Sequence, residues 1–292
     1  FLGGEPLMNF PVIKEVVAYG RELEKRYGKV FKFTTTTNAV LMNDEIMDFL
    51  NREMDNVVIS IDGRPEVHDR MRPTPNGKGS YDVIVPKFEK LIAGRGTKDY
   101  YLRGTFTRFH KDFAEDVKAL AAIGRNVSVE PVVGKREDPY ALQEEDLPEL
   151  EAEYERLAEY LKDHPETNFF HFNVDLAQGP CVIKRLRGCG AGCEYVAITP
   201  DGDIYPCHQF VGREEYRMGN VRSGDFDMDI SGKFAELNIY TREDCRNCWA
   251  RFYCSGGCSA SNLLVNGDIK KPHRVGCELE RKRLECAIAL RA

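Results

Sequence analysis

Residues 245–258 read Cys-Arg-Asn-Cys-Trp-Ala-Arg-Phe-Tyr-Cys-Ser-Gly-Gly-Cys, which places four cysteines within fourteen residues. The whole chain contains ten cysteines, and eight of them fall between Cys189 and Cys277. Cysteine thiolates are the preferred ligands of structural zinc and of iron–sulfur clusters. This density therefore predicts a small, loop-rich module that is organised around metal-bound cysteines.

Three kinds of cysteine chemistry compete for this module. Disulfides are disfavoured because a chain of this size with a good core needs no covalent cross-links, and because the sequence carries no sign of export. One structural zinc could use Cys245, Cys248, Cys254 and Cys258, but it would leave the other four cysteines unexplained. Two 4Fe-4S clusters would use all eight, since each takes four thiolates, and the interspersed glycines let the backbone approach a cluster. We therefore favour iron–sulfur clusters.

The overall composition is that of an ordinary globular protein. The chain has 292 residues, 42% hydrophobic and 30% charged, at the upper length that one core serves, so we expect a large domain and a smaller module. The net charge of −6 provides no basic field for nucleic acid. No run of about 18 apolar residues occurs, so no segment is expected to span a membrane. We expect a cytoplasmic protein without nucleic-acid or membrane partners.

The first 180 residues alternate β-branched runs with amphipathic stretches. We expect strands at 30–35, 57–61, 100–107 and 127–133. Helices are expected to start near Asn9 and Asn43 and to cover 80–92 and 113–123, with a solvated acidic helix within 137–163 and turns over 62–79. This alternation predicts parallel βαβ units, whose chemistry sits at the carboxyl ends of the strands.

The composition changes near residue 180, where cysteine and glycine become dense. Residues 195–206 predict a hairpin with Asp201-Gly202 at its turn, and residues 279–290 predict a closing amphipathic helix. We therefore expect two domains, 1–180 and 181–292.

The cysteine spacing resembles a known signature. The chain shows a pattern similar to the seven-cysteine signature of the SPASM domain: Cys189-x12-Gly202-x4-Cys207, then Cys245-x2-Cys248-x5-Cys254-x3-Cys258, then Cys277. Gly3-Gly4-Glu5-Pro6 resembles the GGEP motif of radical S-adenosylmethionine (radical SAM) enzymes, and 60–63 followed by 68–70 resembles a stretch of SPASM peptide modifiers. The resemblance implies an α/β fold, a partial (β/α)6 radical SAM barrel followed by a SPASM domain with two auxiliary 4Fe-4S clusters.

Within that family the segments 188–195, 205–212 and 253–262 look most like the SCIFF maturases, which process a ribosomal peptide with six cysteines. The resemblance implies a thioether between a cysteine sulfur and the α-carbon of a threonine. It also implies a precursor peptide and a low-potential electron donor, such as ferredoxin or flavodoxin, as partners. Alternatives are another SPASM maturase, such as a formylglycine-forming sulfatase-maturating enzyme, or an iron–sulfur electron-transfer module.

The resemblance also suggests how S-adenosylmethionine would be bound. Gly3, Gly4 and Glu5 would hold its amino group. Three further candidates lie at or near the ends of expected strands. Asn38 would face the cofactor, Ser60 would bind a ribose hydroxyl, and Arg103 would pair with the cofactor carboxylate. Glu130 is a weaker candidate. No catalytic residue is assigned.

The family pattern divides the cluster ligands into two sets. Cys189, Cys207 and Cys258 would bind the first cluster, and Cys245, Cys248, Cys254 and Cys277 the second. Cys193 is expected to be a fourth ligand of the first cluster. If it points away instead, one iron stays open for a substrate thiolate. Cys181 and Cys286 are expected to be small buried hydrophobes.

One departure from the family concerns its first cluster, which binds Cys-x3-Cys-x2-Cys upstream of GGEP. No such spacing occurs here, and the chain starts at Phe1 without a methionine. We therefore interpret the chain as a C-terminal fragment that lacks the first barrel strand and that cluster loop. The parent protein, with a third 4Fe-4S cluster, is expected to be the enzyme, and the fragment alone is expected to be inactive.

Overall fold

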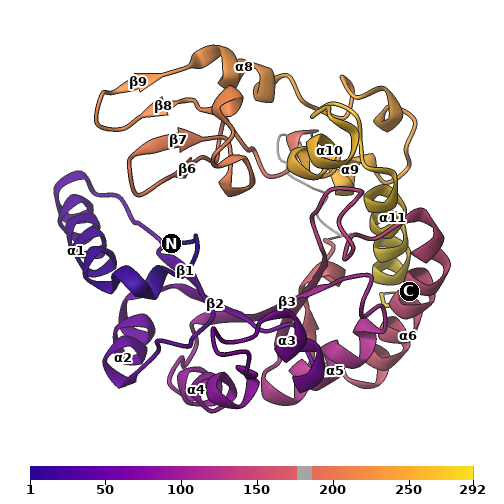
Figure 1. Cartoon of the computed structure of the whole chain (residues 1–292), viewed down its shortest axis with the longest axis horizontal. Helices are drawn as coiled ribbons and strands as arrows, with labels where there is room; N and C mark the ends of the chain where they lie inside the picture. Colours follow the sequence, from indigo (N-terminus) through magenta and orange to yellow (C-terminus); the bar gives the residue numbers. More distant parts are fainter. Residues whose placement is uncertain (176–185, 292) are drawn as a thin grey trace. The chain divides into compact units, whose positions relative to one another are not determined.

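The computed structural model describes residues 1–175 and 186–291, which form two compact units (Figure 1). The sheet unit comprises Phe1–Pro131 and Glu155–Asn173. The cysteine unit comprises Val132–Tyr154 and Val174–Ala292. The expected domain boundary at residue 180 and Cys181 lie outside the described residues.

The sheet unit is built on five parallel strands in sequential order. They are β1 (Thr34–Thr37), β2 (Asn56–Ser60), β3 (Asp99–Phe106), β4 (Asn126–Pro131) and β5 (Asn168–Phe169). Their register sets Thr37 beside Ile59, Ser60 beside Arg103 and Thr105 beside Glu130. The carboxyl ends of these strands therefore meet at one edge, and the expected parallel α/β fold is confirmed.

Helices connect these strands. They are the short η1 (Pro6–Asn9), then α1 (Phe10–Tyr27), α2 (Asp44–Glu53), α3 (Pro65–Met71), α4 (Tyr81–Ala93), α5 (Phe113–Ile123) and, after β5, η3 (Phe170–Phe172). Figure 1 shows α2, α4 and α5 along one face of the sheet. The core between these layers is fully buried and includes Ile59, Leu102, Val129, Phe88 and Leu91.

Local signals place several helix ends as predicted. The Asn43 side chain accepts a hydrogen bond from the Ile46 N–H and starts α2, and Gly28 ends α1 in the left-handed conformation with φ 62°. Two expectations were wrong in detail. The first strand begins at Thr34, four residues late, and α3 occupies part of the stretch expected as turns. Seven residues give little periodicity, and the contacts of buried His68 help to hold α3 in place.

The cysteine unit has short elements. Its antiparallel sheet has the order β6 (Ala197–Ile198), β7 (Asp203–Tyr205), β8 (Gly219–Asn220) and β9 (Asp225–Phe226). The expected hairpin is present, and the Gly202 N–H donates to the Thr199 carbonyl with φ of Gly202 at 90°. A small core of Ile204, Phe210, Met218 and Phe234 packs beneath it.

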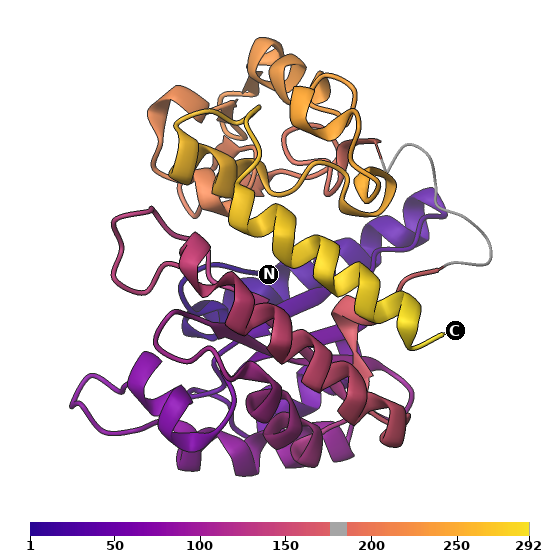
Figure 2. The same ribbon diagram turned by 90° about the vertical axis from the view of Figure 1, so that its right-hand side faces the viewer.

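The other helices of the described residues follow β4. They are η2 (Glu144–Asp146), α6 (Leu147–Asp163), η4 (His208–Phe210), η5 (Glu214–Tyr216), α8 (Met228–Ala235), η6 (Glu243–Cys245), α9 (Arg251–Cys254), α10 (Ser259–Asn266) and α11 (Arg274–Ala289). Helix α6 begins in the cysteine unit and ends in the sheet unit. Figure 2 shows α11 as one unbroken helix, which starts five residues before its predicted beginning. Among the residues described, no helix meets the length and apolarity that a membrane span requires.

Candidate functional site

Glu5 ties the loop that precedes η1 to the end of β1. Its Oε1 accepts hydrogen bonds from the Leu7 N–H (3.0 Å) and the Thr37 hydroxyl (2.8 Å), and its Oε2 accepts from the Asn38 N–H (2.8 Å). A carboxylate can accept about four hydrogen bonds, so the three protein donors leave room for one more. The fixed carboxylate can therefore still accept an ammonium donor at the sheet edge.

Asn38 takes part in the turn that follows β1. Its Oδ1 accepts a hydrogen bond from the Val40 N–H (3.0 Å), while the Thr37 hydroxyl accepts from the Ala39 N–H (2.9 Å). Ala39 is fully buried with φ 58°, a conformation that is uncommon for residues other than glycine. Asn38 is therefore part of a polar turn and is also the residue expected to face the cofactor. The fold brings it next to Glu5.

Arg103 lies beside Ser60 in the register of β2 and β3 and forms a bidentate pair with Glu130 on β4. The Arg103 Nε–Glu130 Oε1 distance is 3.1 Å and the Nη2–Oε2 distance is 2.5 Å. This pairing raises the pKa of Arg103. The guanidinium expected to bind the cofactor carboxylate is therefore already oriented by a carboxylate of the protein.

Sequence analysis missed a histidine next to this pair. His171, in η3, lies 3.1 Å from the Ser128 hydroxyl through its Nε2 and 3.8 Å from Glu130 Oε1. It directly follows β5, whose two residues are too few to show a strand pattern. A polar row results from Arg103 on β3, Ser128 and Glu130 on β4, and His171 in η3 after β5.

The motif at 60–63 and 68–70 forms a buried clamp. Asp62, 3% exposed, accepts two hydrogen bonds from Arg72 (2.7 and 3.0 Å) and one from the Thr105 N–H (3.0 Å). His68, 1% exposed, accepts from the Asp62 N–H through Nδ1 (3.3 Å), and its Nε2 lies 2.9 Å from the Ser80 hydroxyl. These contacts fix the loop between β2 and α4, which supports the sheet edge that carries Ser60.

Three cysteines far apart in sequence are electrostatic neighbours in the cysteine unit. Burial raises the pKa of the Cys207 thiol to about 11, and the nearby thiolates of Cys258 and Cys189 raise it further. Cys207 follows β7, Cys258 precedes α10 and Cys189 lies in a glycine-rich loop. We call these three residues the first thiol set.

A second group forms around the start of α11. Burial raises the pKa of the Cys277 thiol to about 12, and the thiolates of Cys254, Cys245 and Cys248 add to this effect. Cys245 and Cys248 share one turn, in which the Cys248 N–H donates to the Cys245 carbonyl. We call these four residues the second thiol set. These electrostatic contributions group the cysteines in two sets, and their role as cluster ligands stays a prediction.

The backbone around both sets suits bound thiolates. The backbone N–H groups of Gly256 and Gly257 lower the pKa of the Cys254 thiol, and those of Gln209 and Phe210 lower the pKa of the Cys207 thiol, each against the larger effect of burial. Gly256 and Gly257 do so with φ of 89° and 72°, which side chains disfavour. Hydrogen bonds to sulfur stabilise thiolate and tune iron–sulfur clusters.

The arrangement fits clusters better than a single zinc ion. Within residues 1–175 and 186–291, no three Cys, His, Asp or Glu side chains are gathered around one metal position. A 4Fe-4S cluster does not require such convergence, because its four cysteines bind four different irons. Cys258, which the zinc alternative needs, instead lies in the first thiol set.

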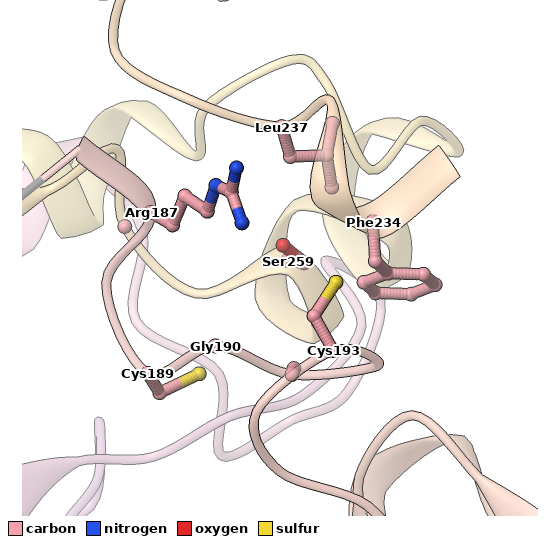
Figure 3. A pocket seen from close by; sticks show the side chains of 9 residues that line it. Arg187, Cys189, Gly190, Cys193, Phe234, Leu237 and Ser259 are labelled. Atoms are coloured by element: carbon pink, nitrogen blue, oxygen red, sulfur yellow. The ribbon is translucent and has the colours of Figure 1, made fainter. Parts of the chain in front are cut away.

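Cys193 lines the same pocket as Cys189, but its thiol is engaged by the protein backbone. Its thiol lies 3.4 Å from the Ser231 carbonyl, to which it donates, and its side chain packs against the small core of the unit. Figure 3 shows its sulfur beside Phe234 and away from that of Cys189, in a pocket into which Arg187 extends. This geometry supports the alternative in which Cys193 points away from the first cluster. Cys286 is buried, as expected.

Comparisons with known proteins match these two regions to iron–sulfur families. Residues 189–249 match the SPASM iron-sulfur cluster-binding domain, and residues 1–86 match a 4Fe-4S single cluster domain. Because each match covers less than half of the chain, the relatives below are needed to establish the family.

Two curated relatives span most of the chain. The mycofactocin maturase MftC of Mycobacterium ulcerans is 30% identical over 286 residues, covering 92% of this chain and 72% of that protein. A cysteine-type anaerobic sulfatase-maturating enzyme of Clostridium novyi is 26% identical, with coverages of 88% and 72%.

A solved structure, "Native anSMEcpe with bound AdoMet and Cp18Cys peptide", shares the fold. It superposes with a TM-score of 0.78 at 17% identity and covers 99% of this chain and 82% of that one. With the two thiol sets and the maturase relatives, this places the chain in the family of radical SAM/SPASM maturases.

Proposed function

We propose that this chain is part of a radical SAM enzyme that forms a thioether in a ribosomally made, six-cysteine peptide. The observation that carries this proposal is the division of seven cysteines into two sets, in which burial raises the pKa of Cys207, Cys254 and Cys277. Two auxiliary clusters bound there would supply electron transfer, and S-adenosylmethionine would supply radical chemistry. The thioether and the six-cysteine substrate rest on the sequence resemblance.

The sheet edge supplies the residues for S-adenosylmethionine. Glu5, held by Thr37 and Asn38, would accept the amino group together with the backbone of Gly3 and Gly4. Arg103 would pair with the carboxylate while Glu130 keeps its guanidinium aligned, and Ser60 would bind a ribose hydroxyl. Parallel sheets bind ligands at this edge, which supports the assignment.

The cluster nearest the substrate would be that of the first thiol set. Cys189 and Cys258 are exposed, whereas the second set has no exposed cysteine among its four members. With Cys193 turned toward Ser231, the first cluster would keep three protein ligands and an iron able to bind a cysteine thiolate of the peptide. Metal binding would deprotonate that thiol and position its sulfur. A low-potential electron donor would be the second partner.

A formylglycine-forming activity is the second candidate, since a sulfatase-maturating enzyme is among the relatives. The two activities differ in product. A thioether joins two residues with loss of two hydrogen atoms, whereas formylglycine converts one side chain to an aldehyde. Mass spectrometry of peptides treated with the parent enzyme distinguishes them, and an aldehyde without a crosslink would overturn the thioether assignment.

Metal content provides the direct test of the cluster sites. The chain is purified and reconstituted anaerobically, and iron, sulfide and zinc are measured. Two clusters predict about eight irons per chain. The variant Cys277→Ser should lose about four of them, whereas Cys286→Ser, a buried cysteine in the same helix, should lose none. Zinc without iron would refute the proposal.

A further inference from the structure

A buried arginine lies between the two thiol sets. Arg242, just before η6, is 4% exposed. Its guanidinium donates to the Gly256 carbonyl, to the Ser259 hydroxyl (2.9 Å) and to the Ile269 carbonyl (3.3 Å). Its Nε is buried and has no hydrogen-bond partner within the described part of the chain. The guanidinium is therefore held by neutral oxygens, and its buried Nε–H is unused.

The largest electrostatic contributions at Arg242 come from thiolates. Burial lowers the pKa of the guanidinium, and the opposing electrostatic contributions come from Cys245, Cys254, Cys258 and Cys189. Two of these cysteines belong to the first thiol set and two to the second. No carboxylate is among these electrostatic partners. A buried guanidinium without an anionic partner is costly, so the arrangement calls for negative charge on both sides.

The backbone is shaped around this side chain. A Cβ on Gly256 would lie 2.6 Å from Arg242 Nη1 and 3.2 Å from its Cδ, so glycine is required at that position. Gly256 and Ser259 flank Cys258, and the Arg242 carbonyl accepts the Cys245 N–H at 3.0 Å. The side chain therefore contacts the segment that joins Cys254 of the second set to Cys258 of the first, while its backbone contacts Cys245.

We propose that Arg242 is a shared counter-charge for two clusters bound by the first and second thiol sets, with its Nε–H as a donor toward cluster sulfur. This inference rests on the proposed function. One-electron reduction adds one negative charge to a cluster, the electron comes from the external donor, and the guanidinium keeps its proton throughout. A fixed positive charge stabilises the reduced form more than the oxidised form, so Arg242 raises both reduction potentials.

The test uses the full chain, reconstituted anaerobically with iron and sulfide. The chain is titrated with dithionite, and electron paramagnetic resonance follows the reduction of both clusters. Arg242→Gln removes the charge and should lower each reduction equilibrium constant about tenfold, which is 59 mV for one electron. Arg242→Lys keeps the charge and should shift both potentials less. Arg217→Gln is the matched control, because Arg217 pairs with Asp203 and its electrostatic partners are carboxylates. It should shift neither potential.

A second measurement does not depend on the glutamine variant holding its clusters. In wild-type chain with isotope-labelled arginine, pulsed resonance spectra of the reduced clusters should show a coupled arginine nitrogen that is absent from Arg242→Lys. Unchanged potentials in Arg242→Gln, a shift of only one cluster, or no coupled nitrogen in the wild type would each overturn the proposal. A wild-type chain that binds no iron would instead refute the proposed function.

Discussion

The two units of this chain treat buried charge in different ways. In the sheet unit, buried Asp62 and Asp116 are each neutralised by an arginine of the same unit, Arg72 and Arg64. In the cysteine unit, Arg242 is buried without a carboxylate among its electrostatic partners and lies next to thiols from both sets. The sheet unit pairs these carboxylates with its own arginines, whereas we propose that bound clusters supply the negative charge beside Arg242.

The two units also differ in the length of their strands. Strands of up to eight residues pair across the sheet unit, and Ile59, Leu102 and Phe88 fill its core completely. Strands of two or three residues form the sheet of the cysteine unit. We therefore expect the cysteine unit to depend on its ligands, because metal binding contributes directly to the folding of such small modules.

Iron removal should give the largest difference between the two units in protection from hydrogen exchange. Chelation from the reconstituted chain should expose the amides of η6, α9 and α10 to solvent exchange, while those of β2 and β3 stay protected. Structural zinc sites contribute about 10–16 kcal/mol in small peptides, which sets the scale of the expected loss. Hydrogen exchange followed by mass spectrometry measures both regions in one sample. Equal loss of protection in both regions would show that the sheet unit also depends on the metal.

The Asp62 clamp tests whether the sheet unit depends on its internal ion pairs. Asp62→Ala should lower the free energy of unfolding by about 3 kcal/mol, because it leaves the Thr105 N–H and Arg72 without their acceptor. Urea denaturation of the metal-free chain measures the change. Asp48→Ala, at an exposed position of α2, serves as the control and should change stability by less than about 0.5 kcal/mol. Equal effects would make the clamp irrelevant to stability.

His68 gives the sheet unit a smaller, pH-dependent signature. Burial lowers the pKa of His68 below its usual 6.5, so below pH 6.5 the unfolded chain binds the proton first. The stabilisation is present above that pH and is lost as the pH falls, by about 1 kcal/mol between pH 7 and 5.5. Urea titrations should show this loss in the wild type and less of it in His68→Gln. A pH slope shared by the wild type and His68→Gln would contradict the assignment.

The smallest expected difference is between substitutions of Cys193 and Cys207, which both lie in the cysteine unit. Cys193→Ser should keep about eight irons, since its thiol donates to Ser231 and a hydroxyl can do the same. The expected stability change is below about 1 kcal/mol. Cys207→Ser should instead alter the resonance signal of the first cluster. A changed first-cluster signal in Cys193→Ser would restore Cys193 as its fourth ligand.

Much of the fold could be predicted because its signals are local. Helix α5 occupies the predicted residues 113–123, and the Asp201-Gly202 turn lies in the predicted hairpin. The weaker predictions concern short elements, such as α3 and β5, whose formation depends on distant contacts. A segment of two to seven residues is too short for its periodicity to stand out against chance.

The sequence by itself determined the parallel α/β plan, the cysteine-rich module and the candidate ligands, because periodicity, turn residues and ligand spacing are written along the chain. Only the tertiary structure paired Glu130 with Arg103 and His171, joined Glu5 to Asn38, and placed Arg242 beside both thiol sets. These contacts join residues that are distant in sequence. They form only when strand register and loop packing bring the residues together, which no local pattern encodes.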